Sequence, residues 1–405
     1  MGLLQAPRLQ ITSAFDAGNI EVVDSTDPSN VQLKIRPDPY CESDAQAHYQ
    51  WFHFQVSTAA GTPLTMHIVN AGSASYASAW QGYRAAASYD MQHWFRVDTS
   101  YDEAAGVLTI QHTPTYPCVR YAYFAPYSWE RHTDLVMRMQ HQPHVQLHLL
   151  GQTLDGRDLH MLQVGSPGPD KAVIWVIARQ HPGESMAEWF AEGLLQRLTA
   201  EGAAAGGDAD VAQLLDTAVL FVVPNMCPDG SVRGHLRTNA VGSNLNREWA
   251  APSAERSPEV LAVSQAIAAT GLDFLLDVHG DEEIAANFIG SMFGVPAWGP
   301  RLERMQTAFT DALLNASPDF QTRLGYALPA PGAANLSTAS KANAQKYNTL
   351  SLVLEQPFKD TTDTPNAETG WSPERAKAFG ASHVSAFLNT VPTLLKERGT
   401  RDEQQ

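Results

Sequence analysis

Ala172-Val173-Ile174-Trp175-Val176-Ile177-Ala178 is an uninterrupted apolar run. A strand buried on both faces has this composition, whereas a half-exposed strand alternates apolar and polar residues. Residues Glu184 to Leu198 follow it with apolar side chains at helical spacing. The two segments together predict a strand and then a helix, the unit from which a sheet covered by helices is built.

The same strand-and-helix pattern continues to the end of the chain. Further buried strands are expected at Ala218–Val223, Phe274–Val278 and Leu350–Leu354, and helices near Pro258–Ala269, Pro300–Asn315 and Pro373–Glu397. This alternation predicts an α/β domain around a mixed, mostly parallel sheet.

The first third of the chain has a different pattern, with short strands and little helical periodicity. The expected strands are Trp51–Val56, Leu64–Val69, Trp94–Val97, Val107–Ile110 and Tyr121–Phe124, all rich in aromatic and β-branched residues. They predict an antiparallel β-sandwich. Because Phe124 to Trp129 contains a proline and three aromatic residues, we place the boundary there, with domains at 1–125 and 126–405.

Polar side chains follow four of the predicted strands at the point where each strand ends: His181, Asn225, His279 and Glu355. In open α/β sheets, ligands bind beyond the carboxyl ends of the strands. The sequence therefore predicts that these four residues meet at one edge of the sheet.

Two of these strand ends supply candidate metal ligands. His181 and Glu184 are three residues apart at a tight strand-to-helix turn, and His279 lies on another strand. A catalytic zinc site uses three nitrogen or oxygen ligands and keeps a fourth position open. His181, Glu184 and His279 supply this set, and Glu282 is expected to lie outside it or in solvent.

The motifs, taken in order, resemble those of the zinc carboxypeptidase family. They are His181-Pro182-Gly183-Glu184, Pro228-Asp229-Gly230, Asn246-Arg247, His279 and Glu355. The N-terminal β domain makes the chain similar to the cytosolic carboxypeptidase branch, which includes deglutamylases. The amino-acid sequences of two segments, Asp277–Glu282 and Leu354–Lys359, are similar to those of bacterial-type members of that branch.

The resemblance implies an enzyme that hydrolyses the C-terminal peptide bond of a peptide or protein, with glutamate as the preferred last residue. One zinc per chain would be held by His181, Glu184 and His279, and Glu355 would be the general base. Asn246 and Arg247 would bind the substrate's terminal carboxylate, and Arg237 would stabilise the oxyanion. The family commonly has Asp where this chain has Asn244, and a neutral amide makes the neighbouring histidine a less basic ligand.

Two other functions stay open from the sequence. A small-molecule zinc amidohydrolase, such as a deacylase of amino acids, would use the same metal scaffold. A catalytically silent zinc protein that binds a partner through its β domain is disfavoured, because it would need neither Arg247 nor Glu355.

Several side chains near the motifs are interpreted as structural. Tyr326 and Tyr347 lie in the stretch where digestive members of the family carry a mobile tyrosine, but packing is the favoured interpretation for both. Lys341, Lys346 and Lys359 are expected on a solvated face.

Composition limits the partners and the location. The formal net charge of −16 argues against nucleic acid and anionic membranes as partners. Three widely spaced cysteines argue against a disulfide framework. Residues 1–8 lack the pattern of a signal peptide, and no apolar run reaches the ~20 residues of a membrane span. We expect a cytoplasmic protein, with a homo-oligomer left open.

Overall fold

The computed structural model describes residues 9–41, 47–199 and 207–402. The expectation drawn from residues 1–8 lies outside this part of the chain. Among the described residues, no helix combines the length and apolar composition that crossing a bilayer requires.

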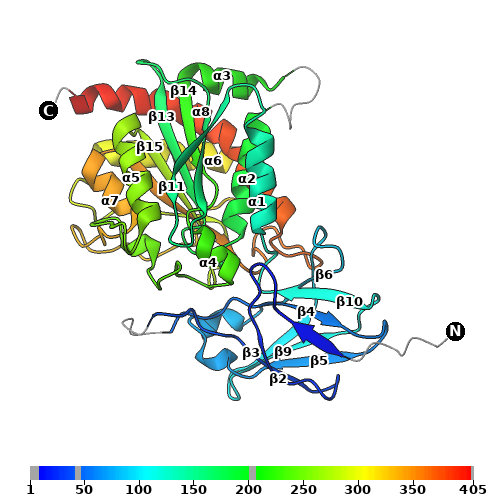
Figure 1. Ribbon diagram of the computed structural model, residues 1–405. Helices are drawn as coiled ribbons and strands as arrows, with labels where there is room; N and C mark the ends of the chain where they lie inside the picture. Colours follow the sequence, from blue (N-terminus) through cyan, green and yellow to red (C-terminus); the bar gives the residue numbers. More distant parts are fainter. Residues whose placement is uncertain (1–8, 42–46, 200–206, 403–405) are drawn as a thin grey trace.

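The N-terminal β domain consists of two five-stranded sheets (Figure 1). One has the order β1 (Gln10–Thr12), β4 (His53–Ser57), β10 (Cys118–Ala122), β6 (Ala86–Ser88) and β7 (Phe95–Arg96). The other has the order β2 (Glu21–Asp24), β3 (Val31–Lys34), β5 (Leu64–Ile68), β9 (Val107–His112) and β8 (Asp98–Asp102). Pairing is antiparallel except between β3 and β5.

The α/β domain contains a seven-stranded sheet. Its order is β11 (Val145–Gln152), β12 (Asp158–Val164), β14 (Ala218–Val223), β13 (Ala172–Ala178), β15 (Phe274–Asp281), β17 (Leu350–Pro357) and β16 (Phe288–Gly290). The four strands from β14 to β17 are parallel, and the strands at both edges are antiparallel. This confirms the predicted fold class, a β-sandwich followed by an α/β domain with a mixed sheet.

Helices cover both faces of this sheet. They are α1 (Trp129–Met139), α2 (Met186–Leu198), α3 (Ala209–Thr217), α4 (Pro228–Arg233), α5 (Pro258–Thr270), α6 (Pro300–Ala316), α7 (Ala339–Tyr347) and α8 (Pro373–Asp402). The residues of strand β13 are all apolar because the strand is buried on both faces. Ile174 and Val176 face the core that contains α2, α6 and α8, whereas Trp175 and Ile177 face the core that contains α5.

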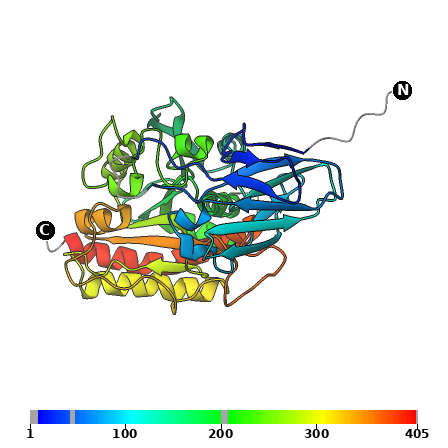
Figure 2. The same cartoon turned by 90° about the horizontal axis from the view of Figure 1, so that it is seen from below.

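The β domain is fixed to the α/β domain by buried contacts. The rings of Tyr123 and Phe358 stack with centroids 4.5 Å apart. Arg96 donates from Nη2 to the carbonyl oxygen of Phe358 at 2.7 Å, and the hydroxyl of Ser185 donates to Ala125 O at 2.9 Å. Figure 2 shows the strands of the β domain beside the helices and strands of the α/β domain. The boundary at residues 125 and 126 stays a prediction.

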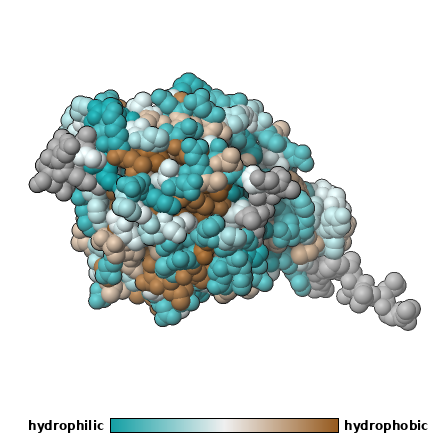
Figure 3. Space-filling view, turned by 90° about the horizontal axis from the view of Figure 1, so that it is seen from above, coloured by the Kyte–Doolittle hydropathy of each residue, from teal (hydrophilic) through white to brown (hydrophobic). Residues whose placement is uncertain are grey.

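The opposite end of the α/β domain is seen in Figure 3, where hydrophilic residues surround several hydrophobic patches. Such a mixed surface is ordinary for a globular protein. The residues that carry chemistry lie at the other end, where the parallel strands finish and the β domain begins.

Candidate active site

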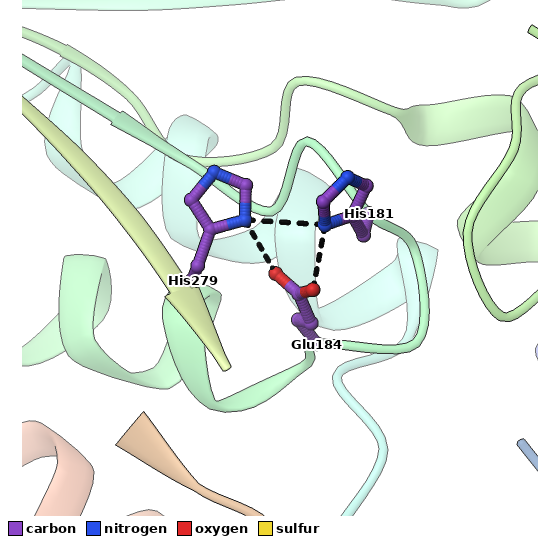
Figure 4. Close-up of side chains that lie close together, drawn as sticks. All are labelled: His181, Glu184 and His279. Atoms are coloured by element: carbon purple, nitrogen blue, oxygen red, sulfur yellow. Dashed lines mark hydrogen bonds and ion pairs between the residues drawn. The ribbon is translucent and has the colours of Figure 1, made fainter. Parts of the chain in front are cut away.

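His181, Glu184 and His279 form a compact cluster at the carboxyl ends of β13 and β15. One carboxylate oxygen of Glu184 lies 2.6 Å from Nδ1 of His181, and the other lies 2.7 Å from Nδ1 of His279 (Figure 4). The two Nδ1 atoms are 3.2 Å apart. All three residues are buried, and their ligand atoms lie within 4.8 Å of one another. Two imidazole nitrogens and a carboxylate therefore converge on one point.

The outward nitrogen of each imidazole faces an oxygen that orients the ring. Nε2 of His181 lies 3.1 Å from Oδ1 of Asn244, and Nε2 of His279 lies 2.9 Å from Oδ1 of Asp277. The Asp277 carboxylate also accepts two hydrogen bonds of 2.8 Å from the side chain of Gln180. Partners of this kind fix the tautomer and direct the inner nitrogen toward a metal.

The residues of the cluster fit a zinc ion by their donor chemistry. Imidazole nitrogen and carboxylate oxygen are the ligands that zinc takes in catalytic sites, with three protein ligands and one open position. Here both Nδ1 atoms and the carboxylate point inward, while the hydrogen-bond partners occupy the outer side.

Charges compensate one another within this cluster. Burial lowers the pKa of His181 to about 3, and Arg237 acts in the same direction. Burial also lowers the pKa of His279, but the carboxylates of Asp277 and Glu184 outweigh it and hold that pKa well above the usual value. The two histidines lower the pKa of Glu184 despite its burial. Glu184 is therefore kept in its charged form, the form in which a carboxylate binds a metal.

Glu355 lies next to His279 because β15 and β17 are parallel neighbours with these two residues paired in register. One oxygen of Glu355, Oε1, accepts a hydrogen bond of 3.0 Å from the hydroxyl of Tyr326. The other, Oε2, is buried without a hydrogen-bond partner in the described residues. Burial raises the pKa of Glu355 well above the usual carboxyl value, so this carboxylate is poised to accept a proton.

A cavity of about 400 Å³ joins the cluster to Glu355, Arg237, Asn246 and Arg247. Asn246 is tied to the site, since its Nδ2 lies 3.3 Å from His279 Nε2 and its Oδ1 accepts from Ala339 N at 2.8 Å. Arg247 is exposed at the wall and donates from Nη1 to the carbonyl oxygen of Asn246 at 2.7 Å. The structure thus brings together the seven side chains to which the resemblance assigned metal, catalytic or substrate-binding roles.

Two family models match successive parts of this chain. One is described as the cytosolic carboxypeptidase N-terminal domain and matches residues 11–124, and the other is zinc carboxypeptidase and matches residues 135–351. The second match alone spans more than half of the chain. The chain belongs to the zinc carboxypeptidase family.

Solved structures of similar proteins support this membership. A metallo-carboxypeptidase from Burkholderia cenocepacia is 46% identical, with a TM-score of 0.91 and coverage of 95% of this chain and 100% of that one. A metallo-carboxypeptidase from Pseudomonas aeruginosa, in complex with (2-guanidinoethylmercapto)succinic acid, is 45% identical, with a TM-score of 0.89 and coverage of 95% and 100%. Cytosolic carboxypeptidase 6 of Mus musculus is 28% identical over 189 residues, which are 43% of this chain and 34% of that protein. The protein is a metallocarboxypeptidase, a hydrolase of peptide bonds.

This zinc carboxypeptidase departs from the common family pattern at Asn244, and the structure shows what the residue does. Its Oδ1 faces His181 and also accepts a hydrogen bond of 3.0 Å from the backbone amide of Asn246. The amide oxygen therefore occupies the bracing position, but without the negative charge that makes an imidazole more basic.

Three residues for which sequence reasoning gave no direct role in the chemistry line the cavity of this zinc carboxypeptidase. Tyr326 bonds to Glu355 and lies 2.8 Å from Asp281, so the packing interpretation was wrong for it. Lys341 lines the cavity and donates to the carbonyl oxygen of Ser291, so it is not on a solvated face. Glu282 lies outside the three-residue cluster, as one of the two expectations had it, and is buried at the cavity wall and not in solvent. Burial and Glu184 raise its pKa well above the usual value.

The other expectations have mixed outcomes. Tyr347 packs against the hydrophobic core that contains α5, as expected. Asn225 lies at a strand end, but its side chain bonds to Glu188 and Ser231 and does not line the cavity.

Tyr76, from the β domain, lines the cavity and was not predicted from the sequence. No local motif marks Tyr76, because it reaches the site only through the docking of the two domains.

Proposed function

We propose that the protein removes single residues from the C-terminus of peptides, with one zinc ion per chain held by His181, Glu184 and His279. The observation that carries this proposal is the arrangement around one cavity. A three-ligand cluster, a carboxylate with an unbonded oxygen and two guanidinium groups all line the same space.

Zinc bound at the cluster would supply Lewis-acid activation of water and of the scissile carbonyl. The remaining roles belong to the protein's own groups. Oε2 of Glu355 would accept a proton from the attacking water and later deliver it to the departing amine. A positioned carboxylate of this kind contributes about 10²–10⁴ in rate.

The guanidinium groups would bind the two oxyanions of the reaction. Arg247, beside Asn246 at the cavity wall, would hold the terminal carboxylate, since a guanidinium can form two parallel hydrogen bonds with it. Arg237 would stabilise the oxygen that becomes negative at the scissile carbonyl, and removing one such donor typically costs about 10²–10³ in turnover.

Lys341 supports a preference for glutamate at the last position. Among the described residues that line the cavity, Lys341 is the one lysine. Its ammonium group could pair with an acidic side chain. The relative from Pseudomonas aeruginosa binds (2-guanidinoethylmercapto)succinic acid, which carries two carboxylates and a guanidino group. A site with both Arg247 and Lys341 is suited to a ligand of that kind.

The small-molecule amidohydrolase is the second candidate, and the size of the cavity is compatible with it. A volume of about 400 Å³ is sufficient for an acylated amino acid. The silent zinc protein has less support, since Glu355 and both arginines line the cavity.

Release of amino acids from a defined peptide panel tests the proposal. The panel has Glu, Asp, Lys, Leu and Phe at the end, each with a free and an amidated C-terminus, and includes N-acyl amino acids. Chelator-sensitive release from the free peptides, restored by zinc, is the expected result. Release from the N-acyl amino acids alone would favour the deacylase. No release from any substrate at one bound zinc per chain would count against both enzymes.

We also keep three broader expectations as proposals. Cys118 and Cys227 are free thiols, which supports a reducing compartment such as the cytoplasm. The boundary near residue 125 is supported by the separate sheets on its two sides. A homo-oligomer can be tested by light scattering of the purified chain.

A further inference from the structure

The segment that carries Arg237 is held by a carboxylate from the other domain. The backbone amides of Leu236, Arg237 and Thr238 all donate to Asp38, at 2.7, 2.8 and 3.0 Å. The hydroxyl of Thr238 adds a fourth hydrogen bond to this carboxylate at 3.1 Å. Successive amides that converge in this way form a concave anion site. Asp38 is 5% exposed, so it fills this site as a buried partner.

A second residue of the β domain holds the tip of the Arg237 side chain. Nη1 of Arg237 donates to the hydroxyl oxygen of Tyr76 at 2.9 Å. Tyr76 is itself fixed, because its backbone amide donates to Oε1 of Gln50 at 2.8 Å and its carbonyl oxygen accepts from Gln50 Nε2 at 3.0 Å. Gln50 is fully buried. The guanidinium is therefore fixed by a hydroxyl with little freedom to move.

The same segment also contacts the turn that carries two of the metal ligands. The amide of Gly183 donates to the carbonyl oxygen of Leu236 at 2.9 Å. A Cβ at Gly183 would lie only 2.8 Å from that oxygen, so the two backbones approach as closely as glycine allows. A path of hydrogen bonds thus runs from Asp38 through residue 236 to the turn between His181 and Glu184.

We propose that Asp38 and Tyr76 of the β domain are positioning residues that set the Arg237 guanidinium in the cavity. This inference rests on the proposed function, since it assigns the two residues to Arg237's part in peptide hydrolysis. Tyr76 also lines the cavity, so a bound peptide would meet its ring. The β domain is therefore a component of the active site and not a separate module.

The expected effect follows from the geometry of catalysis. A donor that stabilises a developing oxyanion must lie within hydrogen-bonding distance of it, and a misplacement of about 1 Å can cost on the order of 10² in rate. Asp38→Asn replaces one acceptor oxygen by an NH2 group, which donates hydrogen bonds and cannot accept them. We expect kcat to fall by about 10–100-fold with a smaller change in KM. Tyr76→Phe removes one hydrogen bond and should have a smaller effect.

The matched control is Arg84→Gln. Arg84 also joins the two domains, since its Nη1 donates to the carbonyl oxygen of Ala367 at 2.6 Å, but it does not line the cavity. This variant should keep kcat and KM. A comparable loss in Arg84→Gln would show that any weakening of the domain contact has the same effect, and would overturn the proposal.

Two measurements separate positioning from general stability. First, Asp38→Asn is made in an Arg237→Ala background. If Asp38 acts through Arg237, the second substitution adds little to the loss caused by the first, whereas an equal further loss would overturn the proposal.

Second, hydrogen–deuterium exchange is followed in peptides that cover residues 235–239. The amides of Leu236, Arg237 and Thr238 should lose protection in Asp38→Asn and keep it in Arg84→Gln. Unchanged protection in Asp38→Asn would contradict the proposed positioning even if activity fell. Because exchange needs no substrate, this result stands apart from the peptide panel, and the two proposals can fail separately.

Discussion

Two walls of the cavity differ in whether sequence motifs indicate the residues that form them. The sheet wall, made of His181, Glu184, His279 and Glu355, comes from strand ends or the turns that follow them. The β-domain wall, made of Tyr76 with Asp38 behind it, comes from irregular segments without a motif. The comparison shows that the groups proposed for metal binding and proton transfer come from the sheet itself, while the groups that contact Arg237 and its backbone come from the other domain.

If the sheet wall carries the chemistry, Glu355→Gln should cause the largest loss of activity. An amide cannot accept a proton from water, so kcat should fall by about 10²–10⁴. The zinc content, measured by atomic absorption, should stay at one per chain because Glu355 is not a ligand. A zinc-replete Gln variant with normal turnover would move the proton transfer to another group, with Asp281 as the next carboxylate to test.

Arg247→Ala should give the next largest effect, and one that depends on the substrate. A hydrogen bond to a charged group is worth about 1.5–3 kcal/mol, so kcat/KM for peptides with a free C-terminus should fall by roughly 10–100-fold. Any slow cleavage of amidated peptides should be little affected. Equal losses on both kinds of peptide would mean that Arg247 does not recognise the terminal carboxylate.

Lys341 should give a smaller effect that depends on pH. Burial lowers the pKa of Lys341 to about 8. Below that pH the ammonium group can pair with an acidic last residue, and above it the group becomes neutral. The ratio of kcat/KM for Glu-ended over Leu-ended peptides should therefore decline as pH rises through about 8. Lys341→Met should make this ratio low and independent of pH, and a ratio that still declines would exclude Lys341 as the selector.

Asn244→Asp should give the smallest effect, and in the opposite direction. The new carboxylate would face Nε2 of His181, where Asn244 now places a neutral oxygen. A more basic imidazole should bind zinc more tightly, by up to about 10-fold in affinity. Competition with a fluorescent chelator would measure it. Weaker zinc binding in the variant would show that the amide is the better partner in this site.

The sequence allowed much of the fold and the sheet wall to be predicted. The apolar run of β13 required burial on both faces, and the parallel strands then required His279 and Glu355 to meet at one edge. Helix α1 and strand β12 were not predicted. Helix α1 could have been found, because its buried residues His132, Leu135, Val136 and Met139 stand at helical spacing. Strand β12 carries polar residues among its buried ones, and local periodicity does not reveal that burial.

The sequence by itself singled out the candidate metal ligands and the candidate base, because these depend on residue type at fixed spacing from a strand end. It also determined the order of the two domains, because their strand patterns differ along the chain. Only the tertiary structure decided the positions of Tyr76, Asp38, Tyr326 and Lys341. Asp38 and Arg237 are 199 residues apart, and Tyr76 and Arg237 are 161 apart. Contacts between residues so far apart in sequence depend on how the two domain cores dock. Local sequence patterns indicate only which residues each core buries. Tyrosine and lysine can pack, bind or stay in solvent, so only their surroundings in the folded chain decide among these roles.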